Sequence, residues 1–190
     1  MSASRPLPPP RKSGGKPLFD CLRERESRRE YDFKPLPEQL LSDLLWATFG
    51  ISRPDGKRTA PTAFDCREFD LYLFTASGVA RYDAEYHALI PILDRDHRRD
   101  VCANEWIPTA PLDIVFIADY ARMNDCPPDM RDYCATADVG FICENLSLSC
   151  ASEELSSCVI GSFDADKLRV LLSLRSEQKI LMAQTVGFPK

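Results

Sequence analysis

The stretch that decides the fold is residues 112–118, Leu-Asp-Ile-Val-Phe-Ile-Ala. Its only charged residue is Asp113, and the β-branched and aromatic side chains around it favour strands. The run lacks the apolar–polar alternation of a strand with one wet face, so we expect a strand that is buried on both faces. A strand of this kind belongs to the interior of a sheet.

Weaker patterns on either side of this strand predict the other elements. Residues 69–74 alternate, and residues 79–82 follow them across a short turn, so the two segments predict a hairpin. Helical spacing begins after Pro37 and ends at Gly50. The remaining expectations are strands over 157–160 and 179–186, a short helix from 18 toward 27, and helices over 94–104, 138–155 and 164–174. Interspersed strands and helices indicate a mixed α+β fold, with the sparsely charged 138–155 helix running through the core.

The length of 190 residues fits one domain. Residues 1–16 differ from the rest, because they are rich in proline and glycine and carry basic residues but no acidic one. Such a segment cannot bury itself and stays extended and mobile unless a surface holds it. We therefore divide the chain into an extended proline-rich, basic arm over residues 1–16 and a single domain over residues 17–190.

The overall composition argues against several function classes. The formal net charge is −5, and the basic arm leaves the body of the chain more acidic still. An acidic body disfavours nucleic-acid binding, which depends on neutralising phosphates. No apolar run approaches the roughly 20 residues of a membrane-spanning helix, and the N-terminus lacks the apolar stretch of a secretory signal. We therefore expect a cytoplasmic protein with neither a membrane nor a nucleic-acid partner.

Eight cysteines and only two histidines limit the side-chain chemistry. No two cysteines have the CxxC spacing, and a zinc site needs such close pairs, so we expect no structural metal. The two histidines leave little scope for a Ser-His-Asp or Cys-His site, and we expect His87 on an exposed turn and His97 on the surface. We interpret the cysteines as reduced, mostly buried thiols, with a disulfide-stabilised binding module as the alternative.

Two short motifs carry the functional signal. In residues 25–29, Arg-Glu-Ser-Arg-Arg, a hydroxyl lies between guanidinium groups at two-residue steps. Arginine holds phosphate through a planar fork of donors, and a nearby hydroxyl adds one more. Residues 58–63, Arg-Thr-Ala-Pro-Thr-Ala, form a tight turn of small residues where backbone can approach a flat ligand. Together the motifs predict a bound phosphorylated cofactor. A solvated helix end with Ser27 as an ordinary cap stays open for the first motif.

Taken in order, these and other pieces of the chain resemble the FMN-dependent nitroreductase family. The resemblance covers residues 17–190. The order and the separations of the pieces make it specific, although no single piece is. The pieces are Arg25-x-Ser27-x-Arg29 followed by Tyr31, the helix end 44–51, the loop 55–63, Ala110-Pro111-Leu112, the helix 138–146, Val159-Ile160-Gly161 and the closing Val186-Gly187-Phe188-Pro189.

The resemblance implies a central, mostly antiparallel sheet flanked by helices, in an interlocked homodimer. It implies two FMN sites at the subunit interface, each built from both chains. Arg25 and Arg29 would neutralise the FMN phosphate, Ser27 would bond phosphate or ribityl oxygens, and Lys190 would reach the phosphate. Gly161 would lie near the flavin N5 edge, where a missing side chain permits close approach. The other residues implied to bind the cofactor are Asn145, Ile160 and, in the loop that covers the ring from the partner chain, Pro61, Thr62, Ala63 and Asp65.

The activity implied by the resemblance is a two-step electron transfer. NAD(P)H would reduce FMN, and a nitroaromatic, a quinone or a similar small acceptor would then take the electrons. The flavin carries this chemistry, so the resemblance implies neither a catalytic protein residue nor a metal. Two alternatives stay open. One is a flavin-dependent dehydrogenase or oxidase of a specific metabolite or peptide that does not use NAD(P)H, and the other is a non-catalytic flavin-binding protein.

Glu26 and Asp65 are among the residues that depart from the family's pattern. Glu26 lies where many relatives carry a basic residue, so we expect it to point away from the phosphate or to pair with Arg28 or Arg29. Asp65 lies where relatives often place an amide side chain that bonds the flavin ring. Negative charge near the flavin would disfavour its anionic reduced form and lower its potential.

Overall fold

Strand β5 (Leu112–Asp119) lies in the interior of the sheet, and all eight of its residues are buried. In this computed structural model, which describes residues 4–190, β5 pairs antiparallel with β2 (Phe69–Thr75) on one side. On the other side it pairs antiparallel with β7 (Gln178–Gly187). The prediction of a strand buried on both faces is therefore confirmed.

The remaining strands extend this centre to a seven-stranded sheet with the order β1-β4-β3-β2-β5-β7-β6. Strands β3 (Gly78–Asp83) and β4 (Ala88–Leu93) continue beyond β2, and the short β1 (Arg5–Pro6) forms that edge. Strand β6 (Ser156–Ile160) forms the other edge beside β7. Every pair of neighbours is antiparallel, which confirms the expected type of sheet.

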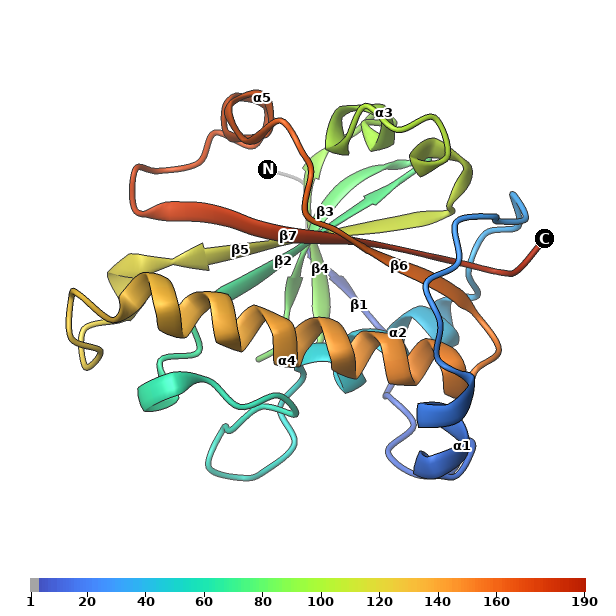
Figure 1. Ribbon diagram of the computed structural model, residues 1–190, viewed down its shortest axis with the longest axis horizontal. Coiled ribbons are helices and arrows are strands. Elements are labelled where there is room, and N and C mark those ends of the chain that lie inside the picture. The colour runs from blue at the N-terminus through green and yellow to red at the C-terminus, as the bar shows by residue number, and fades with distance from the viewer. Residues whose placement is uncertain (1–3) are drawn as a thin grey trace.

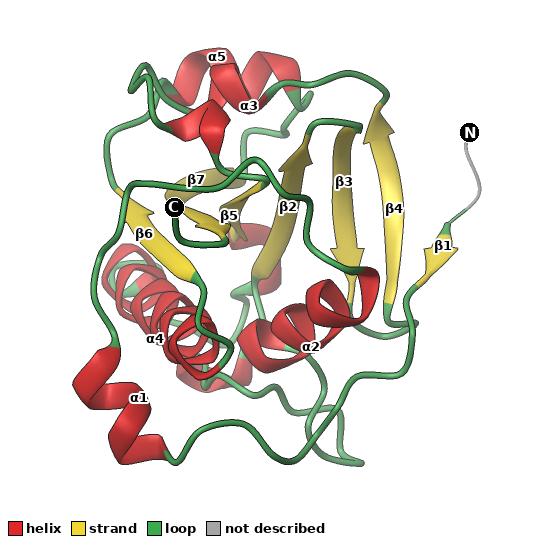
Figure 2. Ribbon diagram, turned by 90° about the vertical axis from the view of Figure 1, so that its right-hand side faces the viewer, coloured by secondary structure: helices red, strands yellow, loops and turns green. Residues whose placement is uncertain are grey.

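Helices cover both faces of the sheet (Figures 1 and 2). The long helix α4 (Arg131–Ser152) lies on one face together with α2 (Glu38–Phe49), and α1 (Leu18–Glu24) packs beside the C-terminal end of α4. The short helices α3 (Arg98–Val101) and α5 (Ala165–Leu171) lie on the opposite face. This arrangement confirms the mixed fold with a flanked sheet. The 3-10 turns are η1 (Ala63–Asp65), η2 (Ile107–Thr109) and η3 (Tyr120–Arg122).

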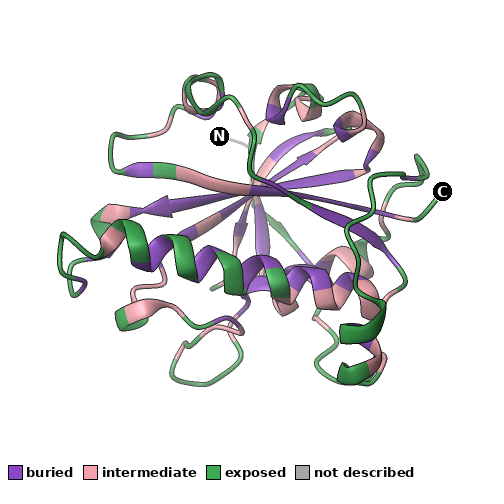
Figure 3. Ribbon diagram, viewed as in Figure 1, coloured by how far each residue is buried: buried purple, intermediate pink, exposed green. Residues whose placement is uncertain are grey.

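A hydrophobic core lies on each side of the sheet, and β5 contributes to both because its side chains alternate. Ile114 and Phe116 pack in the core beneath α2 and α4, whereas Val115 and Ile117 pack in the core beneath α3 and α5. All four side chains are 0% exposed, and each face therefore needs its helices. Figure 3 shows this buried centre in purple, with exposed residues on the outer surfaces of the helices.

Helix α4 has a buried side and an exposed side. Val139, Ile142 and Leu146 are completely buried against the sheet. On the outer side, Tyr133 is 74% exposed and Phe141 is 50% exposed. The expectation that this helix runs through the core therefore holds for only one of its faces in the single chain.

One predicted helix was wrong in its extent, and one strand was not predicted. The helix expected over residues 94–104 is reduced to the four residues of α3. The carboxylate of Asp96 accepts hydrogen bonds from the backbone and the guanidinium of Arg98, and this local turn replaces the first helical residues. Strand β4 was missed because Pro91 interrupts its apolar run. Pro91 lies opposite Ala80, next to a shift in the register between β3 and β4, where its missing N–H is tolerated.

Residues 4–16 of the proline-rich segment pack on their own chain. Leu7 is only 7% exposed, and its N–H donates to the carbonyl of His87 at 3.0 Å. The hydroxyl of Ser42 donates to the carbonyl of Pro8 at 2.6 Å, so it accepts from Nε2 of His87, also at 2.6 Å. The hydroxyl of Tyr82 lies 2.8 Å from Nδ1 of the same ring. His87 does lie on a turn, but these contacts leave it half-buried. The prediction that this turn exposes His87 was therefore wrong.

We predict that Ser42→Ala loosens the N-terminal segment. The change removes the hydrogen bond to Pro8 and leaves Nε2 of His87 without its partner. Loss of such a buried contact costs about 1–3 kcal/mol of unfolding free energy, measured by urea denaturation. Trypsin should also cleave faster after Arg11. Ser13→Ala is the control, because Ser13 is exposed. Equal cleavage rates in the two variants would contradict the prediction.

Candidate functional site

The segment after α1 runs beside the edge strand β6. Ser27 forms a parallel bridge with Ser157, and the N–H of Arg28 donates to the carbonyl of Ser157 at 3.0 Å. A few residues later Tyr31 bridges antiparallel to Pro189. The structure therefore brings the arginine motif, β6 and the C-terminal end of the chain together at one edge of the sheet.

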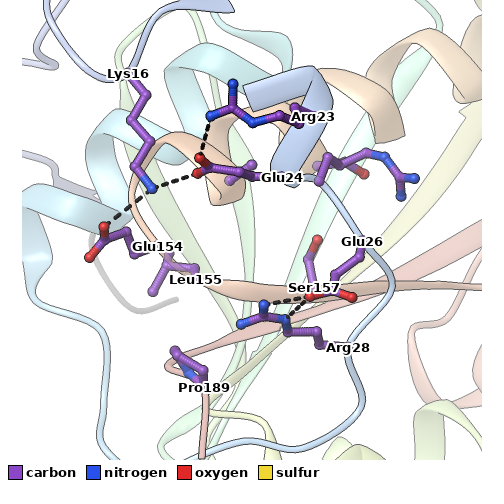
Figure 4. Close-up of a pocket in the computed structure, with 12 residues that line it drawn as sticks. Lys16, Arg23, Glu24, Glu26, Arg28, Glu154, Leu155, Ser157 and Pro189 are labelled. Atoms are coloured by element: carbon purple, nitrogen blue, oxygen red, sulfur yellow. Dashed lines mark hydrogen bonds and ion pairs between the residues drawn. The ribbon is translucent and has the colours of Figure 1, made fainter. Parts of the chain in front are cut away.

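A cavity of about 510 Å³ opens beside this segment (Figure 4). It lies between α1, the arginine motif and the C-terminal half of α4, and its floor includes Ser157 and Pro189. Its lining carries four cationic and three acidic side chains. The charged residues are Lys16, Arg23, Arg25, Arg28, Glu24, Glu26 and Glu154.

Most cations of this cavity already have acidic partners. Nζ of Lys16 lies 2.9 Å from Glu24 and 3.2 Å from Glu154. Nε of Arg28 donates to Glu26 at 2.6 Å, which confirms the expectation that Glu26 pairs with a neighbouring arginine. Arg25 differs, because its contact with an acid is a long 3.9 Å approach of Nε to Glu144 on α4. Arg25 therefore offers the guanidinium that is most available to an anion.

The other predicted residues of this edge lie along β6 and the chain end. The guanidinium of Arg29 lies 5.9 Å from the centre of the Trp106 ring. Arg29 and Arg25 therefore contact different residues. Ile160 is 4% exposed at the end of β6, and a Cβ added to Gly161 would meet nothing within 4 Å. Gly161 thus leaves open space in the single chain. Lys190 follows the bridge at Pro189 and is exposed.

The loop expected to cover a flat ligand is a strained turn that is held by hydrogen bonds and an ion pair. Phe64, Asp65 and Arg67 have φ values of 54°, 53° and 51°, which non-glycine residues rarely adopt. The N–H of Arg67 donates to the hydroxyl of Thr62 at 3.0 Å. The guanidinium of Arg67 binds the carboxylate of Asp65 and holds the pKa of that carboxyl below its ordinary value. Such strain persists because the neighbouring contacts fix the turn.

The predicted residues fall into two groups within one chain. Arg25, Ser27, Arg29, Ile160, Gly161 and Lys190 lie along the β6 edge, whereas Pro61, Thr62, Ala63 and Asp65 lie in the loop that is tied to the N-terminal half of α4. Across residues 4–190 no hydrogen bond or ion pair joins the two groups. Asn145 lies on α4 between them, with its amide nitrogen 3.4 Å from the carbonyl of Thr48.

Sequence reasoning missed residues that fold onto the site from elsewhere. Lys16 belongs to the basic N-terminal segment, and Ser157 comes from β6, yet both line the cavity. Trp106 lies under Arg29 from the segment before β5. The basic character of residues 1–16 was a signal for Lys16, whereas no pattern distinguished Ser157 or Trp106.

A pair of buried acids supports the strained loop. The carboxylate of Asp138, on α4, accepts the N–H of Ala63 at 2.8 Å. Beside it lies Glu68, which is 0% exposed. Burial above all, together with the neighbouring carboxyl of Asp138, raises the pKa of Glu68 to about 7, although a backbone hydrogen bond and Arg122 act in the opposite direction. Burial also raises the pKa of Asp138. The loop is therefore anchored to a pair that is stable when one member is protonated.

Several other chemistries find no support in the described part of the chain. All eight cysteines are free, which confirms that they are thiols. Burial raises the pKa of Cys143 and of Cys150 to about 12, so neither forms a reactive thiolate at neutral pH. Within residues 4–190 no cluster of histidine, cysteine and acidic side chains could hold a metal ion. None of the helices described there combines the length and the apolar character needed to cross a membrane.

We predict that Glu68 lowers the unfolding free energy as the pH rises from about 4.5 to about 7. Glu68 has an ordinary pKa of 4.5 when unfolded and about 7 when folded, so in this window the folded chain keeps a proton that the unfolded chain loses. The stabilisation is complete below pH 4.5 and lost above pH 7, and is on the order of 3 kcal/mol. Urea denaturation of Glu68→Gln across this range should show a flatter profile than the wild type.

The exposed Glu105, changed to Gln, is the control for this measurement. Because Asp113 is also buried with a raised pKa, only the difference between the wild type and Glu68→Gln isolates Glu68. Parallel profiles for these two proteins would refute the assignment.

Comparison with known proteins places the chain in a family. The model described as the nitroreductase family matches residues 22–188. A candidate nitroreductase of Methanocaldococcus jannaschii is 28% identical over 175 residues, which span 87% of this chain and 88% of its own. The crystal structure of a candidate nitroreductase from Ralstonia eutropha JMP134 has a TM-score of 0.91 and 34% identity, covering 100% of this chain and 96% of that one.

A further crystal structure, of a candidate nitroreductase from Desulfovibrio desulfuricans in complex with FMN, shares the fold. Its TM-score is 0.68 at 16% identity, over 93% of this chain and 88% of that one. The sheet order, the long helix and the ordered motifs agree with the match along most of the sequence, and the chain belongs to the nitroreductase family.

Proposed function

We propose that this protein is an FMN-dependent oxidoreductase that passes electrons from NAD(P)H to a nitroaromatic, a quinone or a similar small acceptor. Membership of the nitroreductase family supports the class of activity. The observation that carries the proposal to this chain is the cavity beside β6, where the acid nearest to Arg25 among residues 4–190 lies 3.9 Å away. An available guanidinium next to a hydroxyl-bearing segment is suited to a phosphate.

The residues of the cavity fit the phosphate end of FMN. Arg25 would neutralise the phosphate, and Lys16 could turn toward it from its exposed ion pairs, which cost little to exchange. Ser27 and the neighbouring Ser157 would add hydroxyl donors from the same edge. Glu26 does not oppose this arrangement, because its charge is taken up by Arg28.

At the other end of the cofactor, the protein would orient the ring. Bound FMN would supply hydride acceptance and donation at N5, which no side chain here can perform. Gly161 would leave that edge free of a side chain, since open space surrounds its Cα. The turn at residues 61–65 would close over the ring and exclude water. Its anchoring to Asp138 would keep the turn in position during turnover.

The separation of the two residue groups supports a homodimer. The exposed side of α4 carries Tyr133 and Phe141, and α1 exposes Phe19 to 83% and Leu18 to 61%. Large apolar side chains gathered on outer helix faces are typical of a surface that another chain covers. A second copy seated there would bring its own 61–65 loop toward the β6 edge of the first. Each FMN site would then draw on both chains.

The identity of the electron donor distinguishes the proposed activity from its alternatives. Anaerobic addition of NADH or NADPH to the as-purified yellow protein should bleach the flavin absorbance. A flavin-dependent dehydrogenase or oxidase would be bleached by its own metabolite or peptide and not by NAD(P)H, and a non-catalytic flavin protein by neither.

The eight free thiols fit a reducing compartment, which supports a cytoplasmic location.

We predict that Arg25→Gln weakens FMN binding by about 10- to 100-fold, because a hydrogen bond to a charged group contributes roughly 1.5–3 kcal/mol. Fluorescence titration of the apoprotein with FMN measures the change. Riboflavin, which lacks the phosphate, should bind the variant and the wild type equally. Arg95→Gln is the charge-matched control, since its side chain is 85% exposed far from the motif. Equal FMN affinities for Arg25→Gln and Arg95→Gln would contradict the assignment.

A further inference from the structure

A second cavity, of about 220 Å³, lies on another part of the molecule. It is formed by the end of α2, the loop at Arg58, and strands β2 and β3, and it shares no lining residue with the cavity beside Arg25. Three guanidinium groups line it, those of Arg58, Arg81 and Arg122, over the apolar side chains of Phe49, Phe69 and Leu71. None of the residues proposed to hold FMN lines this cavity.

Two of the three guanidinium groups are paired with carboxylates of the chain. Nη1 of Arg81 lies 3.4 Å from the carboxylate of Asp70, and Nη2 of Arg122 lies 2.7 Å from the same group. Arg122 also approaches Asp119 at 3.7 Å. These contacts form a network in which each arginine has an acidic partner.

Arg58 has no such partner. Among residues 4–190, no carboxylate lies within 4.0 Å of its guanidinium, and its Nε is buried without a hydrogen-bond partner. Its contacts are a long 3.4 Å hydrogen bond from Nη1 to the carbonyl of Phe49 and the ring of Phe49, 5.2 Å from the guanidinium carbon. Arg58 is half-buried, and a cation that loses part of its contact with water without gaining a counter-ion is unfavourable, so a ligand that supplies the missing charge would stabilise it.

We propose that this cavity binds a small organic monocarboxylate, with its carboxylate on Arg58 and its apolar body against Phe49 and Phe69. Guanidinium and carboxylate form strong charge-assisted hydrogen bonds. The lining also holds three acids, Asp70, Asp83 and Glu85, which disfavour a ligand with more than one negative charge. Asp70 is already shared by two arginines, and Asp83, which accepts the N–H groups of Glu85 and Tyr86, adds charge that would repel a phosphate dianion. The volume admits a ligand about the size of benzoate.

Calorimetric titration of the as-purified, full-length protein with benzoate tests the proposal. Benzoate should bind about tenfold or more tightly than its neutral isostere benzamide, and Arg58→Gln should remove that preference. Arg53→Gln, an exposed arginine of the same loop, should keep it. The flavin absorbance, recorded in parallel, reveals any binding over the ring. Absent binding, equal binding of the two probes, or a preference that survives in Arg58→Gln would overturn the proposal without affecting the proposed activity.

The stability of the unliganded protein provides a second readout. If Arg58 serves a ligand, then Arg58→Gln should unfold at the same or a higher temperature than the wild type, since it removes an uncompensated cation. Arg98→Gln should unfold at a lower temperature, because Arg98 is bonded to Asp96 and to the carbonyl of Ala110 at 2.7 Å. A melting temperature for Arg58→Gln that falls as far as that of Arg98→Gln would assign Arg58 a structural role and overturn the inference.

Discussion

Burial of β5 on both faces is the constraint on which the rest of the structure depends. Because Ile114 and Phe116 point to one side and Val115 and Ile117 to the other, neither face of the sheet can be left to solvent. Helices α2 and α4 cover the first face, and α3 and α5 cover the second. Covering the first face with one long helix has a further effect. It places the arginine motif at one end of α4 and anchors the strained loop at the other, so that a single chain holds the two halves of the expected site apart.

Charge pairing then determines which side chains of each half can receive a ligand. In the cavity beside β6, Lys16 and Arg28 are engaged by glutamates, and Arg25 is left with a distant one. The same contrast appears in the second cavity, where Arg81 and Arg122 share Asp70 while Arg58 has no carboxylate within 4.0 Å in the described part of the chain. Arginine-rich surfaces are common, but an arginine without a partner beside a cavity is more informative, because desolvation penalises it until an anion arrives. The pattern of neutralised and available cations therefore says more about ligands than the number of basic residues does.

Much of the fold could be predicted from the sequence, because its strongest patterns are local. The apolar run of β5, the β2–β3 hairpin and the helix between Pro37 and Gly50 depend on spacing and on turn residues within a few positions. Strand β4 could not be predicted, since Pro91 is accepted where the register shifts and where β1 no longer pairs with β4. The docking of the N-terminal segment depends on Ser42, His87 and Tyr82, which meet only in the folded chain.

The candidate site shows the same limit. Its motif residues were found from the order of short patterns, and the pairing of Glu26 with a neighbouring arginine followed from charge alone. The carboxyl pair of Glu68 and Asp138 could not be found in this way, because its members are far apart in sequence and look like surface acids. The structure also changes how Asp65 acts. Its carboxylate is bound by Arg67, so a ring beneath this turn would face an ion pair and not a lone negative charge. The lowering of the flavin potential expected from Asp65 should accordingly be small, with Arg67 as the residue that offsets it.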